Sequence, residues 1–529
     1  MTFKLNNRYA YIYRMIKIIH FFLKITLLSI LFIGCSDLQK KNNKEIKPNI
    51  IVIYTDDLGY GDVSAYNKGT LITPNMDKLA NGGIRFTNGY ASSATCTPSR
   101  YALLTGTYPW RNSKAKILTG ASLIIDTSEM TLPKMLKTVG YNTGIVGKWH
   151  LGLGLSKIDY NSNISPGPNQ VGFDYSHIMA DTQDRVPSVY IENGDVVNLD
   201  KNDPIYVDFK SNFEGQPTGL NNPELTTMKW HHGHNSSIVN GIPRIGFMKG
   251  GKKARWSDID MADHFLKKAQ DYITNNRDEP FFLYYALQQP HVPRIPHPRF
   301  EGKSGMGPRG DVILEADWCI GELYKTLESE GILDNTLIIF SSDNGPVLND
   351  GYYDDAVEKL GDHTPSGGLR GGKYSLFEAG AKVPFVAYWK GKIDPAVSNK
   401  MISQIDLLNS ISTIVSSNIK SSDGQDLSNL ILNNEGEGRE ELVLEASTRT
   451  AYRNGDWIMI PPYKGDAVAK NVNIELGNSL EFQLYNIKHD PKQENNLALN
   501  ESEKLKEMMS KFVAIRGSNF SNIKKLKLE

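Results

Sequence analysis

The chain has 529 residues, of which 40% are hydrophobic, 59 are basic and 59 are acidic. This length and composition allow a large hydrophobic core and a smaller second domain. A net charge of zero provides no general attraction to nucleic acid, so we expect no nucleic-acid partner and only local anion specificity.

The amino end predicts an export signal. A basic start at residues 15–20 precedes an apolar run from Phe21 to Ile33, which is too short to span a membrane. The segment Leu31-Phe32-Ile33-Gly34-Cys35 resembles a bacterial lipobox, which implies cleavage before Cys35 and lipid attachment to it. A plain secretory signal is the alternative. We expect a signal peptide over 1–34, a polar tether over 35–47, and a location at the outer membrane or in the periplasm of a Gram-negative bacterium.

Four apolar runs have strand character, and each ends in polar residues. They are Asn49–Tyr54 before Asp56-Asp57, Gly144–Gly147 before Lys148-Trp149-His150, Phe281–Leu287 before Gln288-Gln289-Pro290-His291, and Thr336–Phe340 before Ser341-Ser342-Asp343-Asn344. Continuous β-branched and aromatic runs indicate strands buried on both faces of a parallel sheet. Helical periodicity at 132–139, 256–273 and 312–327 lies between them, so we predict an α/β fold with a large, mostly parallel central sheet flanked by helices. Because such sheets bind ligands at the carboxyl ends of their strands, the polar clusters predict a common site.

The regions outside this alternation of strands and helices predict an insertion and a small C-terminal subdomain. Residues 155–251 are polar, rich in Asn, Gly and Pro, and typical of insertions over an active-site face. Within them, His231-His232-Gly233-His234 favours a loop that contacts substrate or solvent over a zinc site. A helix over 402–415, short strands at 441–445, 457–460 and 482–485, and a helix over about 501–514 predict a C-terminal α+β subdomain over 393–529. Cys319, in a predicted helix over 311–327, is expected to be a buried packing residue.

The segment Cys96-Thr97-Pro98-Ser99-Arg100 predicts the start of a helix that binds an anion. Pro98 falls in the first turn, where its missing N–H costs nothing. Cys96 then lies at the positive end of the helix dipole, and Arg100 reaches the same face with a guanidinium suited to a tetrahedral oxyanion.

Asp56, Asp57, Asp343 and Asn344 supply only hard oxygen ligands, which suit Ca²⁺ or Mg²⁺ rather than zinc. Carboxylates that converge in a cleft need a cation, and these four residues follow two strands of the predicted sheet. We therefore predict a metal site at this edge.

These motifs together resemble the type I sulfatases of the alkaline phosphatase superfamily. Cys96 to Arg100 matches the sulfatase signature C-x-P-x-R, in which the Cys is oxidised to formylglycine after translation. The further matches, in the family's order, are the segments 48–62, 73–80, 83–87, 147–152, 342–345, 369–373, 484–487, 490–491 and 495–498. The resemblance implies an alkaline-phosphatase-like catalytic domain over 48–392 that hydrolyses sulfate esters. It also implies a formylglycine-generating enzyme or an anaerobic maturase as a partner.

The resemblance also implies a role for each matching residue. Hydrated formylglycine at 96 attacks sulfur, and Arg100, Lys148 and Lys373 bind the sulfate oxygens. His291 protonates the leaving alcohol, and His150 assists release of sulfate by contacting the second hydroxyl at residue 96. One Ca²⁺ bound by Asp56, Asp57, Asp343, Asn344 and residue 96 holds a sulfate oxygen.

The sequence leaves alternatives open for the reaction and the substrate. Phosphonate monoester and phosphodiester hydrolases of the same superfamily also carry C-x-P-x-R, and a surface carbohydrate-binding lipoprotein that is never matured is a further alternative. An exported enzyme with a long insertion suits a sulfated polysaccharide or its oligosaccharides. We expect His363 and Arg370 to bind sugar at the rim of the pocket; the alternative is that Arg370 pairs with a local acid and His363 is structural.

Overall fold

The computed structural model describes residues 9–21, 47–69, 71–116 and 119–518, in two compact units, Met1–Lys47 and Pro48–Glu529. In the first unit, residues 9–21 form an exposed helix. Nearly all of the predicted lipobox and tether, including Cys35, lies outside the described residues. Across the described ranges, we find no helix with both the length and the apolar character that crossing a membrane requires.

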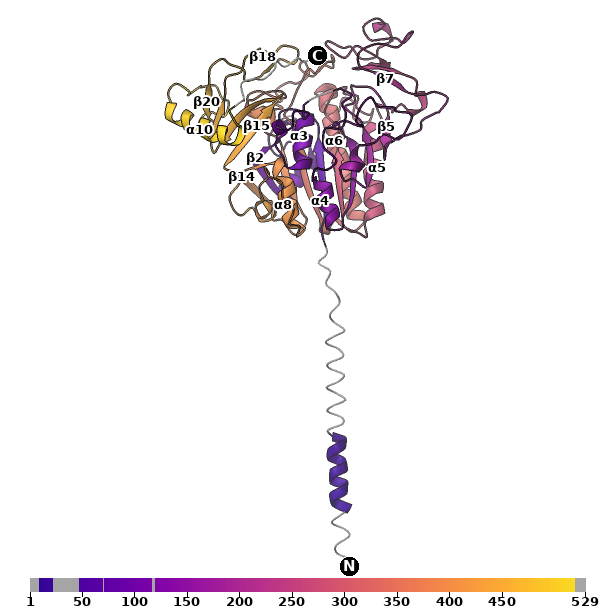
Figure 1. Cartoon of the computed structure of the whole chain (residues 1–529), viewed down its shortest axis with the longest axis vertical. Helices are drawn as coiled ribbons and strands as arrows, with labels where there is room; N and C mark the ends of the chain where they lie inside the picture. The colour runs from indigo at the N-terminus through magenta and orange to yellow at the C-terminus, as the bar shows by residue number, and fades with distance from the viewer. Residues whose placement is uncertain (1–8, 22–46, 70, 117–118, 519–529) are drawn as a thin grey trace, which may run out of the picture. The chain divides into compact units, whose positions relative to one another are not determined.

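A ten-stranded mixed sheet forms the centre of the second unit, in the order β14-β2-β13-β12-β1-β11-β3-β4-β5-β6 (Figure 1). Its middle contains four adjacent parallel strands, which are β12 (Thr336–Ser342), β1 (Asn49–Thr55), β11 (Phe281–Ala286) and β3 (Asn142–Lys148). Ile53 of β1 is level with Tyr285 of β11 and Phe340 of β12. All residues of β1, β11 and β12 are buried, which confirms the prediction from their continuous apolar runs.

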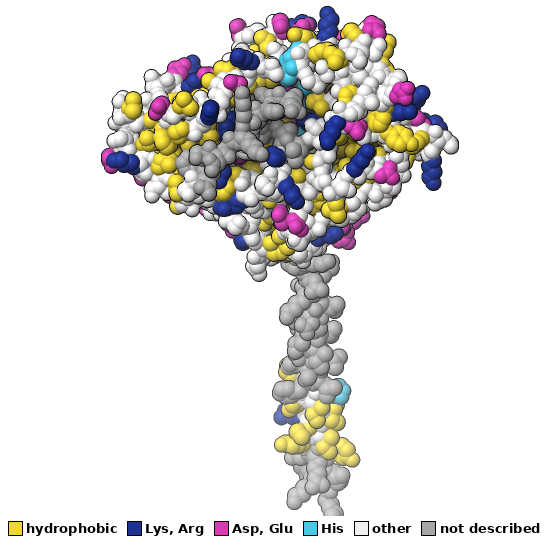
Figure 2. Space-filling model, turned by 45° about the horizontal axis from the view of Figure 1, so that its top comes forward, with side chains coloured by type: hydrophobic (Ala, Val, Ile, Leu, Met, Phe, Trp, Pro, Cys, Tyr) yellow, Lys and Arg dark blue, Asp and Glu magenta, His cyan; other side chains and the backbone are white. Residues whose placement is uncertain are grey.

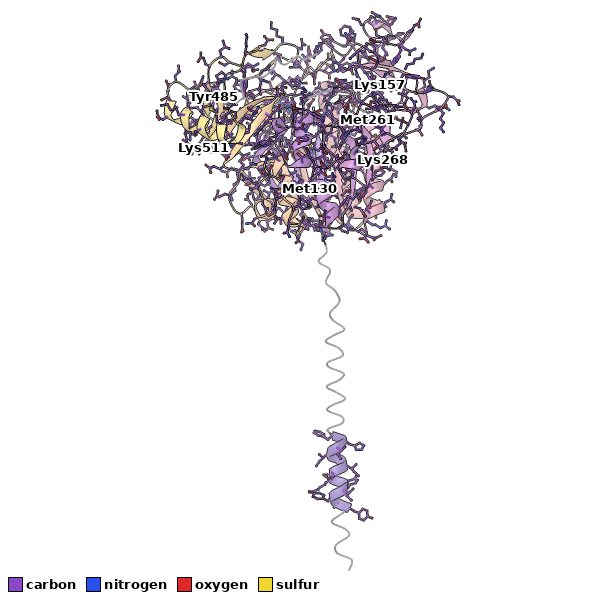
Figure 3. All side chains as sticks on the ribbon, in the orientation of Figure 1. Met130, Lys157, Met261, Lys268, Tyr485 and Lys511 are labelled. Atoms are coloured by element: carbon purple, nitrogen blue, oxygen red, sulfur yellow. The ribbon has the colours of Figure 1, made fainter. Side chains whose placement is uncertain are left out.

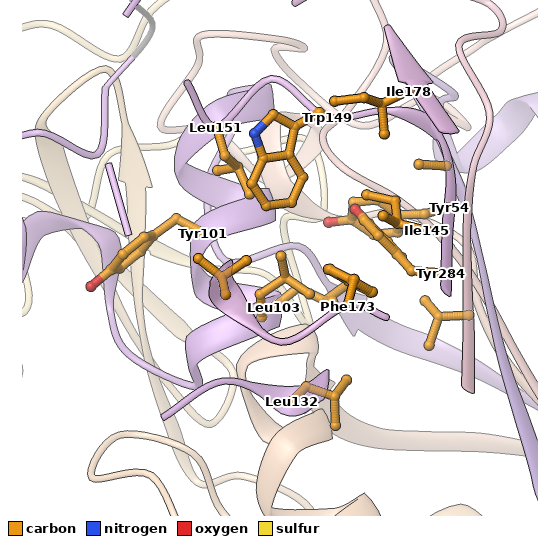
Figure 4. Close-up of a cluster of buried hydrophobic side chains, with 14 of the residues drawn as sticks. Tyr54, Tyr101, Leu103, Leu132, Ile145, Trp149, Leu151, Phe173, Ile178 and Tyr284 are labelled. Atoms are coloured by element: carbon orange, nitrogen blue, oxygen red, sulfur yellow. The ribbon is translucent and has the colours of Figure 1, made fainter. Parts of the chain in front are cut away.

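The two faces of the sheet belong to two hydrophobic clusters, because successive residues of a strand point to opposite sides. Ile51 and Ile53 pack with one set of helices, which are α2 (Pro74–Gly82), α5 (Met261–Asn276) and α6 (Gly307–Ser329). Met261 and Lys268 mark α5 in Figure 3. Tyr54 packs on the opposite face with α3 (Cys96–Thr105), α4 (Leu132–Thr138) and α8 (Leu407–Ile414), and Figure 4 shows part of this cluster. Cys319 on α6 is fully buried, as expected.

The predicted insertion contributes strands to the sheet. β4 (Tyr175–Met179) pairs with β3 in parallel, and β5 (Tyr190–Glu192) and β6 (Asp195–Val196) follow as antiparallel edge strands. The short strands β7 (Tyr206–Asp208), β8 (Ile238–Val239), β9 (Ile242–Pro243) and β10 (Phe247–Lys249) form two small hairpin-like sheets. Strands this short leave little periodicity in the sequence, so only their irregular surroundings were predicted.

The predicted boundary before residue 393 is too early for the sheet. β14 (Ala396–Ser403) pairs in parallel with β2 (Ile84–Tyr90), which pairs with β13 (Phe385–Tyr388), so this strand belongs to the central sheet. The pairing partner is more than 300 residues away in sequence, at Ile84 for Ala396, and local patterning cannot reveal it.

A separate antiparallel sheet lies C-terminal to these elements, which confirms the predicted α+β subdomain. Its strands are β15 (Glu441–Ala446), β16 (Arg449–Asn454), β17 (Trp457–Ile460) and β20 (Gln483–Asn486). The helix α10 (Ser502–Arg516) buries Met508 and Phe512 in the same cluster as this sheet; Tyr485 and Lys511 mark the region in Figure 3. The smaller elements are α7 (Glu378–Ala381), α9 (Ser428–Asn433), β18 (Val468–Ala469) and β19 (Ile474–Glu475).

Candidate active site

The carboxyl ends of the central parallel strands bring the predicted site residues together. Asp56 and Asp57 follow β1, Lys148 ends β3, and Asp343 follows β12. β2 runs in the same direction as β12, because both are antiparallel to β13, and it leads to Cys96 at the first residue of α3. The prediction that these clusters share one edge of the sheet is therefore confirmed.

Three buried carboxylates meet beside Cys96. One ligand atom from each of Asp56, Asp57, Asp343 and Cys96 lies within 4.8 Å of all the others. The Asp57 amide donates to Asp343 Oδ1 at 3.2 Å, and Asn344 Nδ2 donates to Asp57 Oδ1 at 2.7 Å. Burial and repulsion from Asp343 raise the pKa of Asp56 well above its ordinary value. Asn344 Oδ1 is buried without a hydrogen-bond partner among the described residues, so the cluster offers an unused hard oxygen ligand.

Three buried cations surround these carboxylates. Arg100 donates from Nε at 3.0 Å and from Nη2 at 2.8 Å to Asp343 Oδ2, and Lys148 donates to Asp56. Lys373 Nζ lies 2.9 Å from Asp57 Oδ2 and 2.9 Å from Asp350 Oδ2. Opposite charges thus lie side by side in a space where solvent screens them weakly.

Cys96 is 1% exposed, and its Sγ lies 3.6 Å from Asp56 Oδ1. Burial and the nearby Asp343 raise the pKa of its thiol well above the ordinary value.

The two histidines expose different ring nitrogens to the site. His291 Nδ1 donates to the Val292 carbonyl at 2.7 Å, so its Nε2, 3.8 Å from Asp57 Oδ2, is the atom that can exchange a proton. His150 Nε2 accepts from Arg185 Nη1 at 2.9 Å, and its buried Nδ1 has no hydrogen-bond partner in the part of the chain that the structure describes. Burial and neighbouring lysines (Lys373 and Lys148 for His291, Lys148 for His150) lower the pKa of both rings well below the ordinary value.

The backbone at two of these positions is strained. Asp57 has φ of 65° and His150 has φ of 53°, values that non-glycine residues rarely adopt. Such conformations cost about 1–3 kcal/mol each and occur where the surrounding structure fixes a functional side chain.

A cavity of about 60 Å³ opens beside Cys96. Its lining consists of Cys96, His150, Asp184, Arg185, His232, His234, Ile245, His291, Asp350, Lys373, Tyr374 and Val472. Asp184, Arg185, Asp350, Tyr374 and Val472 were not predicted from the sequence. The His231–His234 segment was singled out, and the structure joins His234 Nε2 to Asp184 Oδ2 at 2.8 Å, beside the cavity. On the face drawn in Figure 2, basic and acidic side chains are interspersed.

Comparison with protein families identifies the family to which this chain belongs. The model of the Sulfatase family matches residues 48–417. The chain belongs to the sulfatase family. The sulfatase is 48% identical over 486 residues to an N-acetylgalactosamine-6-O-sulfatase of Bacteroides thetaiotaomicron, which covers 90% of this chain and 95% of that relative. It is 32% identical over 412 residues to human arylsulfatase A, covering 76% of this chain and 71% of that relative.

A solved structure supports the same assignment. The sulfatase matches a structure from work on the metabolism of multiple glycosaminoglycans by Bacteroides thetaiotaomicron, with a TM-score of 0.88 and 47% identity. The match covers 89% of this chain and 100% of that chain. The family, the relatives and the fold agree that this protein is a sulfatase with an alkaline-phosphatase-like sheet, as the resemblance implied.

The structure does not place His363 and Arg370 at the rim of the cavity. His363 is 3% exposed, and its Nε2 lies 2.9 Å from Asp62 Oδ1, which also accepts from Arg309. Arg370 forms two hydrogen bonds with Glu475, at 2.8 and 2.7 Å. Neither residue lines the cavity beside Cys96, so the alternative, a structural histidine and an arginine paired with an acid, describes their contacts, although Glu475 is 105 residues away in sequence.

We expect His363→Ala to lower the melting temperature of the sulfatase and to reduce activity equally on small and large substrates. Loss of the imidazole removes a partner of the buried Asp62 carboxylate, which costs about 1–3 kcal/mol. Thermal unfolding together with kcat/KM on an aryl sulfate and on a sulfated oligosaccharide checks this. A loss confined to the oligosaccharide would restore the substrate-binding role.

Proposed function

We propose that this sulfatase removes the 6-O-sulfate of N-acetylgalactosamine units in glycosaminoglycan oligosaccharides. The support is a relative with that activity, to which this chain is 48% identical in an alignment that covers 95% of the relative. The observation in the structure that carries the reaction is that Cys96, Lys373 and two histidines line one cavity, while the buried Arg100 and Lys148 contact the carboxylates beside Cys96.

The side chains suit the cleavage of an anionic ester. Arg100, Lys148 and Lys373 supply the positive charge that sulfate oxygens need in the transition state. In its protonated form, His291 donates a proton to the leaving sugar oxygen from Nε2, because its Nδ1–H is already donated to the Val292 carbonyl. Arg185 holds His150 through its Nε2, so the free Nδ1 is the proton-exchanging atom of that ring.

We propose that residue 96 works as formylglycine. The hydrated aldehyde supplies an oxygen nucleophile that does not depend on thiolate formation. A formylglycine-generating enzyme or an anaerobic maturase is the partner that this modification needs.

The carboxylate cluster fits one Ca²⁺. The oxygens of Asp56, Asp57, Asp343 and the unpartnered Asn344 Oδ1 are the hard donors that this ion prefers, and residue 96 lies next to them. The ion supplies Lewis-acid stabilisation of charge on the ester. It would also balance carboxylate charge that Lys148, Arg100 and Lys373 now contact, which makes these cations available to the substrate.

The substrate proposal predicts a clear order of activities. We expect the sulfatase to release sulfate from N-acetylgalactosamine-6-sulfate at least about tenfold faster, in kcat/KM, than from the 4-sulfate or from N-acetylglucosamine-6-sulfate, since a small polar cavity discriminates positioned hydroxyls. Ion chromatography of released sulfate over these monosaccharides checks this. Equal rates on all three would refute the sugar assignment, and faster turnover of an aryl phosphodiester than of an aryl sulfate would refute sulfate-ester specificity.

We further propose that the enzyme is exported and anchored by a lipid on Cys35. The basic and apolar order of residues 15–33 and the Gly34-Cys35 end support this. Fractionation and metabolic labelling with a radioactive fatty acid, comparing the natural chain with Cys35→Ala, tests the anchor. Label that persists in the variant would contradict it.

A further inference from the structure

The loop that carries Lys373 is held largely by the C-terminal subdomain, which lies beyond the residues matched by the family model. Ser375 Oγ donates to the Glu475 carbonyl at 2.6 Å, and the Leu376 amide donates to the Leu476 carbonyl at 3.2 Å. Tyr374 packs with Val472 and Ile474 in one small hydrophobic cluster. Val472 itself lines the catalytic cavity, so this subdomain forms part of the cavity wall.

Arg449 is the central side chain of this support. Its Nη2 donates to the Tyr374 carbonyl at 2.7 Å, one residue after Lys373, and its Nη1 donates to the Leu476 carbonyl at 2.9 Å and to Asn478 Oδ1. Arg449 is 5% exposed, and none of these acceptors is a carboxylate. Burying a guanidinium against neutral oxygens is costly, and burial lowers its pKa to about 10. These hydrogen bonds tie Arg449 to the backbone next to Lys373.

The hairpin of β15 and β16, which carries Arg449, also contacts the segment just before Cys96. The Ala94 amide donates to the Glu445 carbonyl at 2.7 Å, and the Tyr374 amide donates to the Ala94 carbonyl at 2.8 Å. Glu445 is the next-to-last residue of β15 and Arg449 is the first residue of β16, so the two strands and the tight turn between them reach both catalytic segments. Tyr374 has φ of 73°, a conformation that needs such external support.

We propose that Arg449 is a positioning residue that acts through Lys373, and that the turn between β15 and β16 aligns the sulfate-binding ammonium with residue 96. This inference rests on the proposed function in that Lys373 binds the sulfate group. Arg449 touches neither the cavity nor the ester, so its effect passes through the Tyr374 carbonyl.

The test compares Arg449→Gln with the matched control Arg439→Gln. Arg439 is another buried arginine of the C-terminal region, bound to Asp406 and to the Asp423 carbonyl, and it does not contact the Lys373 loop. On a small aryl sulfate, we expect Arg449→Gln to lower kcat/KM by roughly 10- to 100-fold, since small misplacements of a catalytic group have effects of this size. At a temperature where both variants are folded, Arg439→Gln should stay within about twofold of the natural enzyme although it loses a buried ion pair.

A double-mutant cycle then tests whether the effect of Arg449 depends on Lys373. If Arg449 acts through Lys373, Lys373→Ala with Arg449→Gln is no slower than Lys373→Ala alone. Additive losses, or equal losses in the two arginine variants, would overturn the inference. Hydrogen exchange of residues 370–378 gives a readout without turnover: it should accelerate in Arg449→Gln and not in Arg439→Gln. If the natural enzyme hydrolyses no sulfate ester, the proposed function is wrong. If hydrogen exchange of residues 370–378 is unchanged in Arg449→Gln, the positioning role of Arg449 is wrong and the proposed function is unaffected.

Discussion

Cys96→Ala is expected to reduce sulfate-ester hydrolysis to background while the protein stays folded. The side chain lies at the start of α3, and among the described residues its polar contact is Sγ to Asp56 Oδ1 at 3.6 Å. Its replacement removes the nucleophile position and little packing, so the melting temperature should change by only a few degrees. Initial rates on an aryl sulfate and thermal unfolding measure the two effects.

The matched control is Cys319→Ala, which truncates the other described cysteine in the core on α6. This variant should keep full activity and lose some stability, because it opens a small cavity far from the chemistry. A mass spectrum of the peptide that contains residue 96 should show the aldehyde or its hydrate instead of the thiol. Substantial turnover by Cys96→Ala would disprove the formylglycine mechanism.

Removal of Ca²⁺ by a chelator is expected to abolish turnover and to lower the melting temperature, with added Ca²⁺ restoring both. The ion would neutralise three buried carboxylates that repel one another, among them Asp56, whose pKa is raised. At a free concentration of about 100 times Kd, binding to the native state alone adds about 2.7 kcal/mol to the free energy of unfolding. Calorimetry with and without chelator measures the shift.

Two carboxylate variants make this test specific. Asp343→Asn, in the proposed ligand set, should remove the Ca²⁺ dependence of the melting temperature. Asp406→Asn, which breaks a buried pair with Arg439, should melt earlier yet keep the full response to Ca²⁺. A chelated natural enzyme that neither melts earlier nor loses activity would show that the metal assignment is wrong.

The sequence predicted those parts of the fold whose signal is local. Continuous apolar runs marked β1, β11 and β12, and the polar residues after them had to share an edge once the strands were parallel. The start of α3 at Cys96 was visible in the placement of Pro98 within five residues. These features need no information about distant partners.

The remaining features depend on partners far away in the chain. Arg370 pairs with Glu475 and His363 with Asp62, and no sequence pattern within the loop 361–372 predicts either pairing. Arg185 contacts His150 from an insertion without periodicity, so its place in the cavity was invisible. Long charged side chains find their ion-pair and hydrogen-bond partners in the folded structure, and the residues next to them in sequence carry little information about which partners these are.

The burial of Cys96 sets an order of events in the life of the chain. At 1% exposure, its side chain offers very little surface to a modifying enzyme once the fold is complete. The strand that closes the site, β12, lies 287 residues after its partner β1, measured from Asn49 to Thr336. A growing chain therefore presents residues 96–100 to its surroundings before β12 is made, and the proposed oxidation of residue 96 is expected before the fold is complete.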